Sequence, residues 1–282
     1  MAGAGLLEIK RRIKSITNTQ KITRAMGLVA TAKFRKLRER AGEIDIYYDE
    51  YKRAIEEMLK VNEVEDSVYF QQNSSDIDLY IVVTSDTGLC GSYNANVLNN
   101  VLEDMYQKKV AVITVGERGR AFFKKRNYET IAEFVEIGDK PAFKDASEII
   151  KPAIDAFVAG NVRNVYLAYT KFITSVKQTV EIEKLLPFEK NRDLKSSNME
   201  FDPSVTEVMN YAIPKYLYAT MYHALVNSIA SEYAIRMSAM DNATKNTEKL
   251  LEKLKIAYNR ARQSNITQEI TEIVSGAEAL KE

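Results

Sequence analysis

Several residue types are scarce in this chain of 282 residues, and each shortage excludes a class of protein or site. A single cysteine, Cys90, excludes an internal disulfide and suits a reducing compartment. Tryptophan is absent and His223 is the one histidine, so histidine-based metal sites and catalytic triads are not expected. No apolar run approaches the ~18 residues that a membrane span needs, and the first residues lack the apolar core of a signal peptide. We therefore expect a soluble protein.

Net charge is also nearly absent, but charge is unevenly placed along the chain. Forty Lys and Arg residues against 39 Asp and Glu residues give a formal net charge of +1, so no whole-chain field attracts nucleic acid. Residues 8–40 hold eleven basic residues against two acids, whereas residues 41–69 hold nine acids against three basic residues. The basic half is either a solvated helix face or a surface that meets an acidic protein partner or nucleic acid.

Two long seven-residue repeats flank a middle segment that has none. Their members recur at alternating steps of three and four, which favours two helices that wind left-handedly round each other. The first repeat consists of Leu6, Ile9, Ile13, Ile16, Gln20, Thr23, Gly27, Ala30, Phe34, Leu37, Ala41, Ile44, Tyr48, Tyr51, Ile55 and Met58. The second consists of Tyr222, Val226, Ile229, Tyr233, Arg236, Met240, Ala243, Thr247, Leu250, Leu254, Ala257 and Ala261. We expect helices over about residues 3–60 and 214–281.

Between the repeats, β-rich apolar segments alternate with helical ones, which is typical of an open, partly parallel sheet. The expected strands span residues 78–84, 110–115, 129–135, 164–171 and 179–185, with a weak edge strand third and an antiparallel hairpin last. The expected helices span residues 95–108, 117–126 and 143–159. Asp202-Pro203 is a helix start signal, whereas Pro152 and Pro214 should break or kink their helices.

These patterns predict three parts: an N-terminal coiled-coil helix over residues 1–65, a central α/β domain over residues 76–190 and a C-terminal coiled-coil helix over residues 203–282. The fold class is α/β, in which a long antiparallel coiled coil of the two terminal helices accompanies a central open, Rossmann-like domain.

The antiparallel arrangement also predicts which residues pair. If Lys60 lies beside about residue 206, the numbers of paired residues sum to roughly 266. Met26 then faces the neighbourhood of Met240 and Arg236, and Leu6 faces about residue 260. Beyond that point no helix of the chain covers the apolar stripe, which consists of Ile266, Ile270, Ile273, Ala277 and Leu280.

Residues 84–94 (TSDTGLCGSYN) lie where the first strand leads into a helix, the place where open α/β sheets normally bind ligands. Gly88 and Gly91 could let a phosphate approach. However, neither G-x-G-x-x-G nor G-K-[ST] is present, so we favour a structural turn with a buried Cys90. Asp86 is too far from Asp78, at the other end of the strand, to act with it and is expected to cap a turn. His223 is expected to be a packed helical residue.

Polar or small residues interrupt both repeats: Gln20, Thr23 and Gly27 in the first, and Arg236 in the second. They either fix the register of the two helices at some cost in stability or turn their side chains outward to a surrounding partner. Both interpretations are kept.

Four stretches of the sequence resemble the gamma subunits of F-type ATP synthases, in the order that this family has them. They are IKSITNTQKITRAMGLVATAKFRK, SDTGLCGSYN, RMSAMDNATKN and YNRARQSNITQEITEIVSGAEAL. The resemblance is to the bacterial type, because the paired cysteines of the chloroplast type are missing. Thr87 departs from the pattern: the family usually has Arg or Lys there, which puts the role of a cation in this loop in doubt.

The resemblance implies a central rotor shaft that couples ion flow to ATP synthesis or hydrolysis and has no catalytic residue, metal or cofactor of its own. The implied partners are a ring of three alpha and three beta subunits, the epsilon subunit and the membrane c-ring. A single copy would sit on the cytoplasmic face of the cell inner membrane as a peripheral protein, without nucleic acid. The partner contacts implied by the motifs are Met26, Arg236, Arg262, Gln263, Thr267, Glu269 and Glu272. Charge alone adds Lys21 and Arg24.

Two other functions are weighed against this one. An α/β enzyme with a helical arm would need a nucleophile or phosphate loop that the sequence does not show. A coiled-coil nucleic-acid binder that used residues 11–40 would need stacking groups, and Phe34 is the only aromatic residue there.

Overall fold

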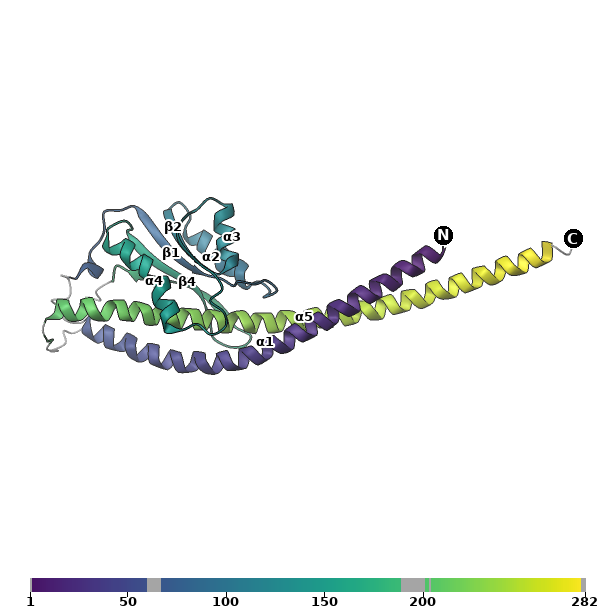
Figure 1. The fold of residues 1–282 in the computed structure, drawn as a ribbon, viewed down its shortest axis with the longest axis horizontal. Helices are drawn as coiled ribbons and strands as arrows, with labels where there is room; N and C mark the ends of the chain where they lie inside the picture. Colours follow the sequence, from purple (N-terminus) through teal and green to yellow (C-terminus); the bar gives the residue numbers. More distant parts are fainter. Residues whose placement is uncertain (1, 60–66, 189–200, 203, 280–282) are drawn as a thin grey trace. The chain divides into compact units, whose positions relative to one another are not determined.

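The computed structural model describes residues 2–59, 67–188, 201–202 and 204–279 (Figure 1). Lys60, Pro203 and Leu280, on which parts of the prediction rest, lie outside the described residues. The chain divides into two compact units, residues 1–29 with 237–282 and residues 30–236. Both long helices, α1 (Ala2–Met58) and α5 (Val205–Ala279), contribute to each unit.

The unit of residues 30–236 is built on a five-stranded sheet with the strand order β3-β2-β1-β4-β5. The strands are β1 (Ile77–Val83), β2 (Lys109–Val115), β3 (Glu129–Phe134), β4 (Asn164–Phe172) and β5 (Gln178–Leu186). All neighbours are parallel except β4 and β5, which pair antiparallel. The predicted partly parallel sheet, the edge position of the third strand and the final hairpin are therefore confirmed.

Helices cover both faces of the sheet, which explains why its central strands are almost continuously apolar. Leu79 and Ile81 face a core that α4 (Phe143–Val158) shares with the two long helices. Tyr80 and Val82 face the opposite core, which α2 (Tyr93–Asp104) and α3 (Glu117–Lys125) close. A short 3-10 helix, η2 (Val68–Phe70), precedes β1.

The two prolines that were predicted to break helices lie inside unbroken ones. Pro152 lies within α4 and Pro214 within α5. A proline costs ~3 kcal/mol inside a helix, but each fully buried apolar side chain returns ~1.5–3 kcal/mol. Ile213 and Leu217 are both completely buried beside Pro214. Tertiary packing therefore keeps α5 continuous, so a break at Pro214 is wrong, whereas the alternative of a kink stays a prediction.

The long helices pair antiparallel within the unit of residues 30–236. Lys33 donates to the Tyr233 hydroxyl (3.2 Å), Arg40 to the Tyr222 hydroxyl (2.5 Å), and the hydroxyls of Tyr48 and Tyr216 lie 3.3 Å apart. The residue numbers of these pairs sum to 262–266, so the predicted register is confirmed in this unit.

The unit of residues 1–29 and 237–282 is a pair of helix segments in the same register. The Thr244 hydroxyl donates to the Thr23 hydroxyl (2.9 Å), and the Gln20 amide donates to Glu248 (3.3 Å). A Cβ atom on Gly27 would lie 3.4 Å from the Cβ atom of Met240. These three interruptions of the first repeat therefore contact the opposite helix, which supports their role in register.

The first repeat is confirmed, since every member from Leu6 to Met58 is buried or half-buried. Every member of the second repeat is buried or half-buried except Leu250 and Ala257, which are exposed and need a correction. Leu250 is 42% exposed, whereas its neighbour Leu251 is 8% exposed. Besides the predicted members, Leu251 is buried and Thr244 and Tyr258 are half-buried. An α-helix drifts by ~20° per heptad from a strict seven-residue repeat, and here the drift brings Thr244, Leu251 and Tyr258 onto the contact face beside Thr247 and Leu254.

The C-terminal part of α5 carries the stripe that was predicted to have no partner helix. Ile266, Ile270 and Ile273 are 47%, 56% and 71% exposed, so this prediction is confirmed for the described residues. Within the described ranges, no helix is both long and apolar enough to cross a membrane.

Candidate partner-contact site

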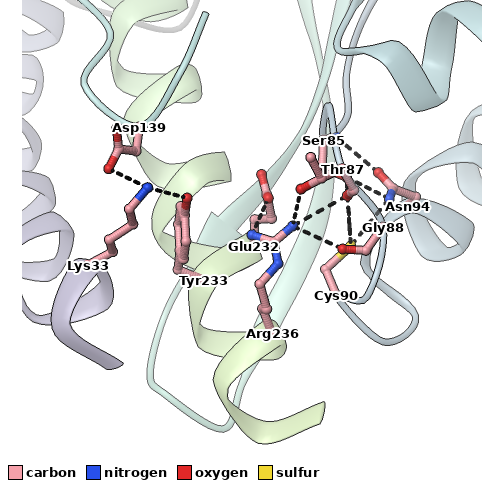
Figure 2. A network of polar contacts seen from close by, with 10 residues as sticks. All are labelled: Lys33, Ser85, Thr87, Gly88, Cys90, Asn94, Asp139, Glu232, Tyr233 and Arg236. Carbon is pink, nitrogen blue, oxygen red and sulfur yellow. Dashed lines mark hydrogen bonds and ion pairs between the residues drawn. The ribbon is translucent and has the colours of Figure 1, made fainter. Parts of the chain in front are cut away.

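Arg236 lies at the centre of a polar network that joins α5 to the loop of residues 84–92 (Figure 2). Its guanidinium group donates to the Thr87 hydroxyl (3.0 Å), and to the carbonyl groups of Thr87 and Gly88 (3.3 Å each). It also forms an ion pair of 2.5 Å with Glu232, one helical turn earlier. Because Arg236 is only 5% exposed, this residue of the second repeat faces its own chain.

Burial raises the pKa of the Glu232 carboxyl above its usual value, although the positive charge of Arg236 opposes this shift. A buried carboxyl group is costly to ionise without a partner, and Arg236 supplies the opposite charge beside Glu232. The sequence contained a signal for this pair, namely opposite charges four residues apart on a helix.

The loop is held in shape by its own side chains. Asn94 accepts from the Ser85 backbone N–H (3.0 Å) and donates to the Ser85 hydroxyl (2.7 Å). Cys90 is buried at 2% exposure, and Asp86 accepts from the backbone N–H of Glu117 at the start of α3 (3.1 Å). The structural turn with a buried cysteine is thus confirmed. Asp86 caps a helix end, which satisfies an N–H group that the helix itself leaves unpaired.

A second contact, within the unit of residues 30–236, joins α1 to α5 and to the segment before α4. The Lys33 ammonium group lies 3.0 Å from Asp139 and 3.2 Å from the Tyr233 hydroxyl (Figure 2). The hydrogen bond to Asp139 raises the pKa of Lys33, and the same bond lowers the pKa of Asp139. Asp139 belongs to the segment between β3 and α4, and nothing in the sequence pattern indicated that it meets α1.

His223 is a packed residue, as predicted, and it has a partner that the sequence did not reveal. Its Nε2 atom lies 2.9 Å from Asp45 of α1, and its ring stacks on Tyr48 with 4.2 Å between the centroids. Burial alone would raise the pKa of Asp45, but hydrogen bonds from His223 and Asn227 outweigh burial and lower it. The pair therefore joins the two long helices.

The predicted contact residues of α1 lie on an open face of the helix. Lys21 and Arg24 are exposed, and Met26 is half-buried. Next to them, Ile22, Leu28 and Val29 are 59%, 68% and 56% exposed. We call Lys21, Ile22, Arg24, Leu28 and Val29 the mixed face. Its combination of apolar and basic side chains suits a protein surface with an apolar centre and acidic groups.

The predicted contact residues of α5 beyond residue 260 are all exposed: Arg262, Gln263, Thr267, Glu269 and Glu272. Most of the predicted residues thus lie in exposed positions on two helix segments, whereas Met26 is half-buried and Arg236 is buried. In the part of the chain that the structure describes, no group of three or more His, Cys, Asp or Glu side chains could hold a metal ion.

Comparison with known proteins gives full-length matches. A sequence profile of the family described as ATP synthase matches residues 5–280. The protein named ATP synthase gamma chain from Clostridium botulinum (strain Hall) is 47% identical over 282 residues, and the alignment covers 99% of each chain. The ATP synthase gamma chain of Clostridium acetobutylicum is 46% identical over 284 residues, with all of both chains covered.

Two solved structures that resemble this chain are also chains of ATP synthases. A chain in the mitochondrial ATP synthase of Tetrahymena thermophila, from the central stalk and c-ring, is similar with a TM-score of 0.60 and 27% identity, covering 79% of this chain and 99% of that one. A chain in the mitochondrial ATP synthase of Euglena gracilis, from OSCP, F1 and c-ring, has a TM-score of 0.74 over 99% of this chain and 95% of that one. At 17% identity, this second similarity concerns the fold.

Proposed function

The chain belongs to the ATP synthase gamma-chain family, and from this membership we propose that it is the central shaft of an F-type ATP synthase. The observation that carries the proposal is the match to gamma chains over 99% of both sequences. The shaft couples ion flow through the membrane c-ring to ATP synthesis or hydrolysis at the alpha and beta subunits. It is a non-catalytic subunit of the complex.

In this proposal the helices of residues 1–65 and 203–282 form the shaft, and the domain of residues 76–190 forms its base. The partners are three alpha and three beta subunits round the shaft, with the epsilon subunit and the c-ring at the base. The proposal of the c-ring as a partner is supported by the similar chain from the central stalk and c-ring of Tetrahymena thermophila. The protein is then peripheral to the membrane, on the cytoplasmic face of the inner membrane.

The mixed face of α1 is the surface that we assign to the beta subunits. Lys21 and Arg24 would pair with acidic groups, while Ile22, Leu28 and Val29 would be removed from water on contact. Coupling requires that the shaft contacts each catalytic subunit differently, since a partner changes an equilibrium only by binding its states unequally. Because the mixed face lies on one side of α1, it would contact each of the three beta subunits differently. Met26, Arg262, Gln263, Thr267, Glu269 and Glu272 are the further contacts that we propose, whereas the buried Arg236 is left out because it binds its own chain.

The charge part of this proposal is tested in the reconstituted complex with the double variant Lys21→Gln/Arg24→Gln. We expect fewer ions pumped per ATP hydrolysed and an unchanged helix content. Single changes should have little effect, since exposed ion pairs contribute ~0.2–1 kcal/mol each. The matched control is Lys124→Gln/Lys125→Gln on α3, two exposed lysines outside the mixed face. Equal pumping by both double variants would contradict the assignment.

Met26 gives a second, independent test. The substitution Met26→Lys adds a positive charge beside the mixed face, whereas Met26→Leu keeps an apolar side chain of similar size. We expect the lysine variant to lower the number of ions pumped per ATP and the leucine variant to leave it unchanged. If both variants pump equally well, Met26 is not part of the contact.

A further inference from the structure

Strand β4 is longer than its neighbour β1, and this leaves part of its backbone without a strand partner. β1 pairs with β4 only as far as Val82 opposite Ala168, whereas β4 continues to Phe172 and pairs with β5 to its end. Peptide groups of a strand point alternately to its two sides. The groups of Thr170 and Phe172 that point to the β1 side therefore need partners from elsewhere, because buried backbone groups are almost always paired.

α5 supplies these partners through three short polar side chains. The Ser228 hydroxyl accepts from the Thr170 backbone N–H, the Ser231 hydroxyl donates to the Thr170 carbonyl, and the Asn227 side chain accepts from the Phe172 backbone N–H. Each of these distances is 3.2 Å. Asn227, Ser228 and Ser231 are at most 1% exposed.

The helix presents two chemically different faces at this level. Val226, Ile229 and Ala230 belong to an apolar cluster with Leu37, Ala41 and Ile44 of α1. The polar side chains between them bind the sheet. Asn227 also donates to Asp45 of α1 (3.0 Å), so one amide group connects β4, α5 and α1.

We infer that Asn227, Ser228 and Ser231 are positioning residues that replace the missing strand beside β4 and fix the place of α5 on the sheet. Hydrophobic contacts are not directional, so an apolar helix face could shift along the sheet at modest cost. A shift of one residue moves a helical side chain by ~1.5 Å along the axis and ~100° around it. The buried backbone groups of β4 would then lose their partners, and burying them unpaired is costly.

The mechanical consequence of this inference rests on the proposed function. A shaft must transmit torque between its α/β domain and its helices, and hydrogen bonds of fixed direction resist both sliding and rotation. Arg236 continues the same attachment further along α5, because its guanidinium group binds the loop after β1. In this way the end of β4 and the loop after β1 hold the same helix.

Hydrogen exchange on the full chain tests the positioning role directly. In the variant Ser228→Ala/Ser231→Ala we expect the amide of Thr170 to exchange about tenfold faster, the factor that corresponds to ~1.4 kcal/mol. In Asn227→Leu, which keeps a side chain of similar size, we expect the same for Phe172. The amides of Tyr166 and Ala168 in the same strand should keep their rates. Ser238→Ala, an exposed serine on the same helix, is the control.

Unchanged exchange at Thr170 and Phe172 would overturn the inference, and so would a uniform acceleration across β4, which would indicate general destabilisation. The single variant Ser231→Ala provides the test if a double variant does not fold. These exchange rates are measured on the isolated chain, so they test the positioning role alone. If the shaft function were wrong, the reconstituted complex with the unchanged chain would hydrolyse ATP without pumping ions. In the reconstituted complex, Ser228→Ala/Ser231→Ala should pump fewer ions per ATP than Ser238→Ala, and equal pumping would refute the role in torque.

Discussion

At the residue scale, Arg236 stabilises the fold through two contacts of very different strength. Its hydrogen bond to the Thr87 hydroxyl is partly open to solvent, whereas its ion pair with Glu232 is buried. Thr87→Val removes one hydroxyl and should lower the free energy of unfolding by no more than ~1 kcal/mol. Arg236→Ala leaves the Glu232 carboxylate buried without a partner and should cost ~3–5 kcal/mol. Urea denaturation of both variants measures the difference, and equal losses would contradict this assignment.

The ion pair of Lys33 and Asp139 gives a pH dependence with a definite sign. Because Lys33 lowers the pKa of Asp139 in the folded protein, the folded chain binds fewer protons than the unfolded one as acid is added. The stabilisation is therefore present above the usual pKa of 3.8 and is lost as pH falls through the lower, folded-state value. Thermal unfolding of Asp139→Asn should occur below that of the unchanged chain at pH ~6, and the gap should narrow near pH ~3. A gap that widens in acid would show that the sign is wrong.

At this scale the sequence predicted which single residues are buried better than it predicted which residues they bind. Burial of Cys90 and His223 followed from composition and helical spacing. By contrast, the partner of Lys33 is an aspartate in a distant loop, and two of the partners of Arg236 are backbone carbonyl groups. A backbone carbonyl has no signature in a sequence, and the approach of two distant segments depends on the whole sheet. Thr87, the departure from the family pattern, is one of these partners.

At the scale of elements, Gly27 marks a place where α1 lies close to α5 in the unit of residues 1–29 and 237–282. A methyl group there would be in ordinary contact with Met240 at 3.4 Å, but a larger side chain has no room. Gly27→Ala should stabilise the chain by ~0.5–1 kcal/mol through helix propensity, whereas Gly27→Leu should destabilise it by ~1–3 kcal/mol. Denaturant unfolding measures both changes.

Gly42→Ala is the matched control, because nothing lies within 4 Å of a Cβ atom on Gly42 of the same helix. It should show the gain in helix propensity alone. If Gly27→Leu were as stable as Gly42→Ala, the close approach of the two helices at residue 27 would be refuted.

The C-terminal segment of α5 should depend on partners for its stability. Ile266, Ile270, Ile273 and Val274 are 47–71% exposed, and an isolated helix of this length is marginal in water. We expect rapid amide exchange over residues 266–277 in the isolated chain and strong protection in the assembled complex. Slow exchange in the isolated chain would mean that the segment is stable by itself.

The elements themselves were largely predictable, for a physical reason. Alternation and apolar runs located all five strands, because burial on both faces leaves a direct trace in composition. The first repeat was read in phase over its whole length. The second was wrong at Leu250 and Ala257, and the adjacent leucines Leu250 and Leu251 fit a seven-residue spacing almost equally well. The effect of Pro214 was also misjudged, since local propensity takes no account of the core on either side of it.

At the scale of the whole molecule, the partner subunits carry out the ATP chemistry and this chain is the part that moves. The place where an open sheet normally binds a ligand, beyond the carboxyl ends of β1 and β4, is filled here by side chains of α5. This agrees with the structural turn that the sequence predicted for residues 84–94.

Rotation is the property that follows most directly from the shaft assignment. The measurement is single-molecule observation of a complex of alpha and beta subunits fixed to a surface, with a bead attached to the α/β domain of this chain. We predict that added ATP makes the bead turn in one direction and that it stops when ATP is removed. A bead that stays still while the same complexes hydrolyse ATP would contradict the account.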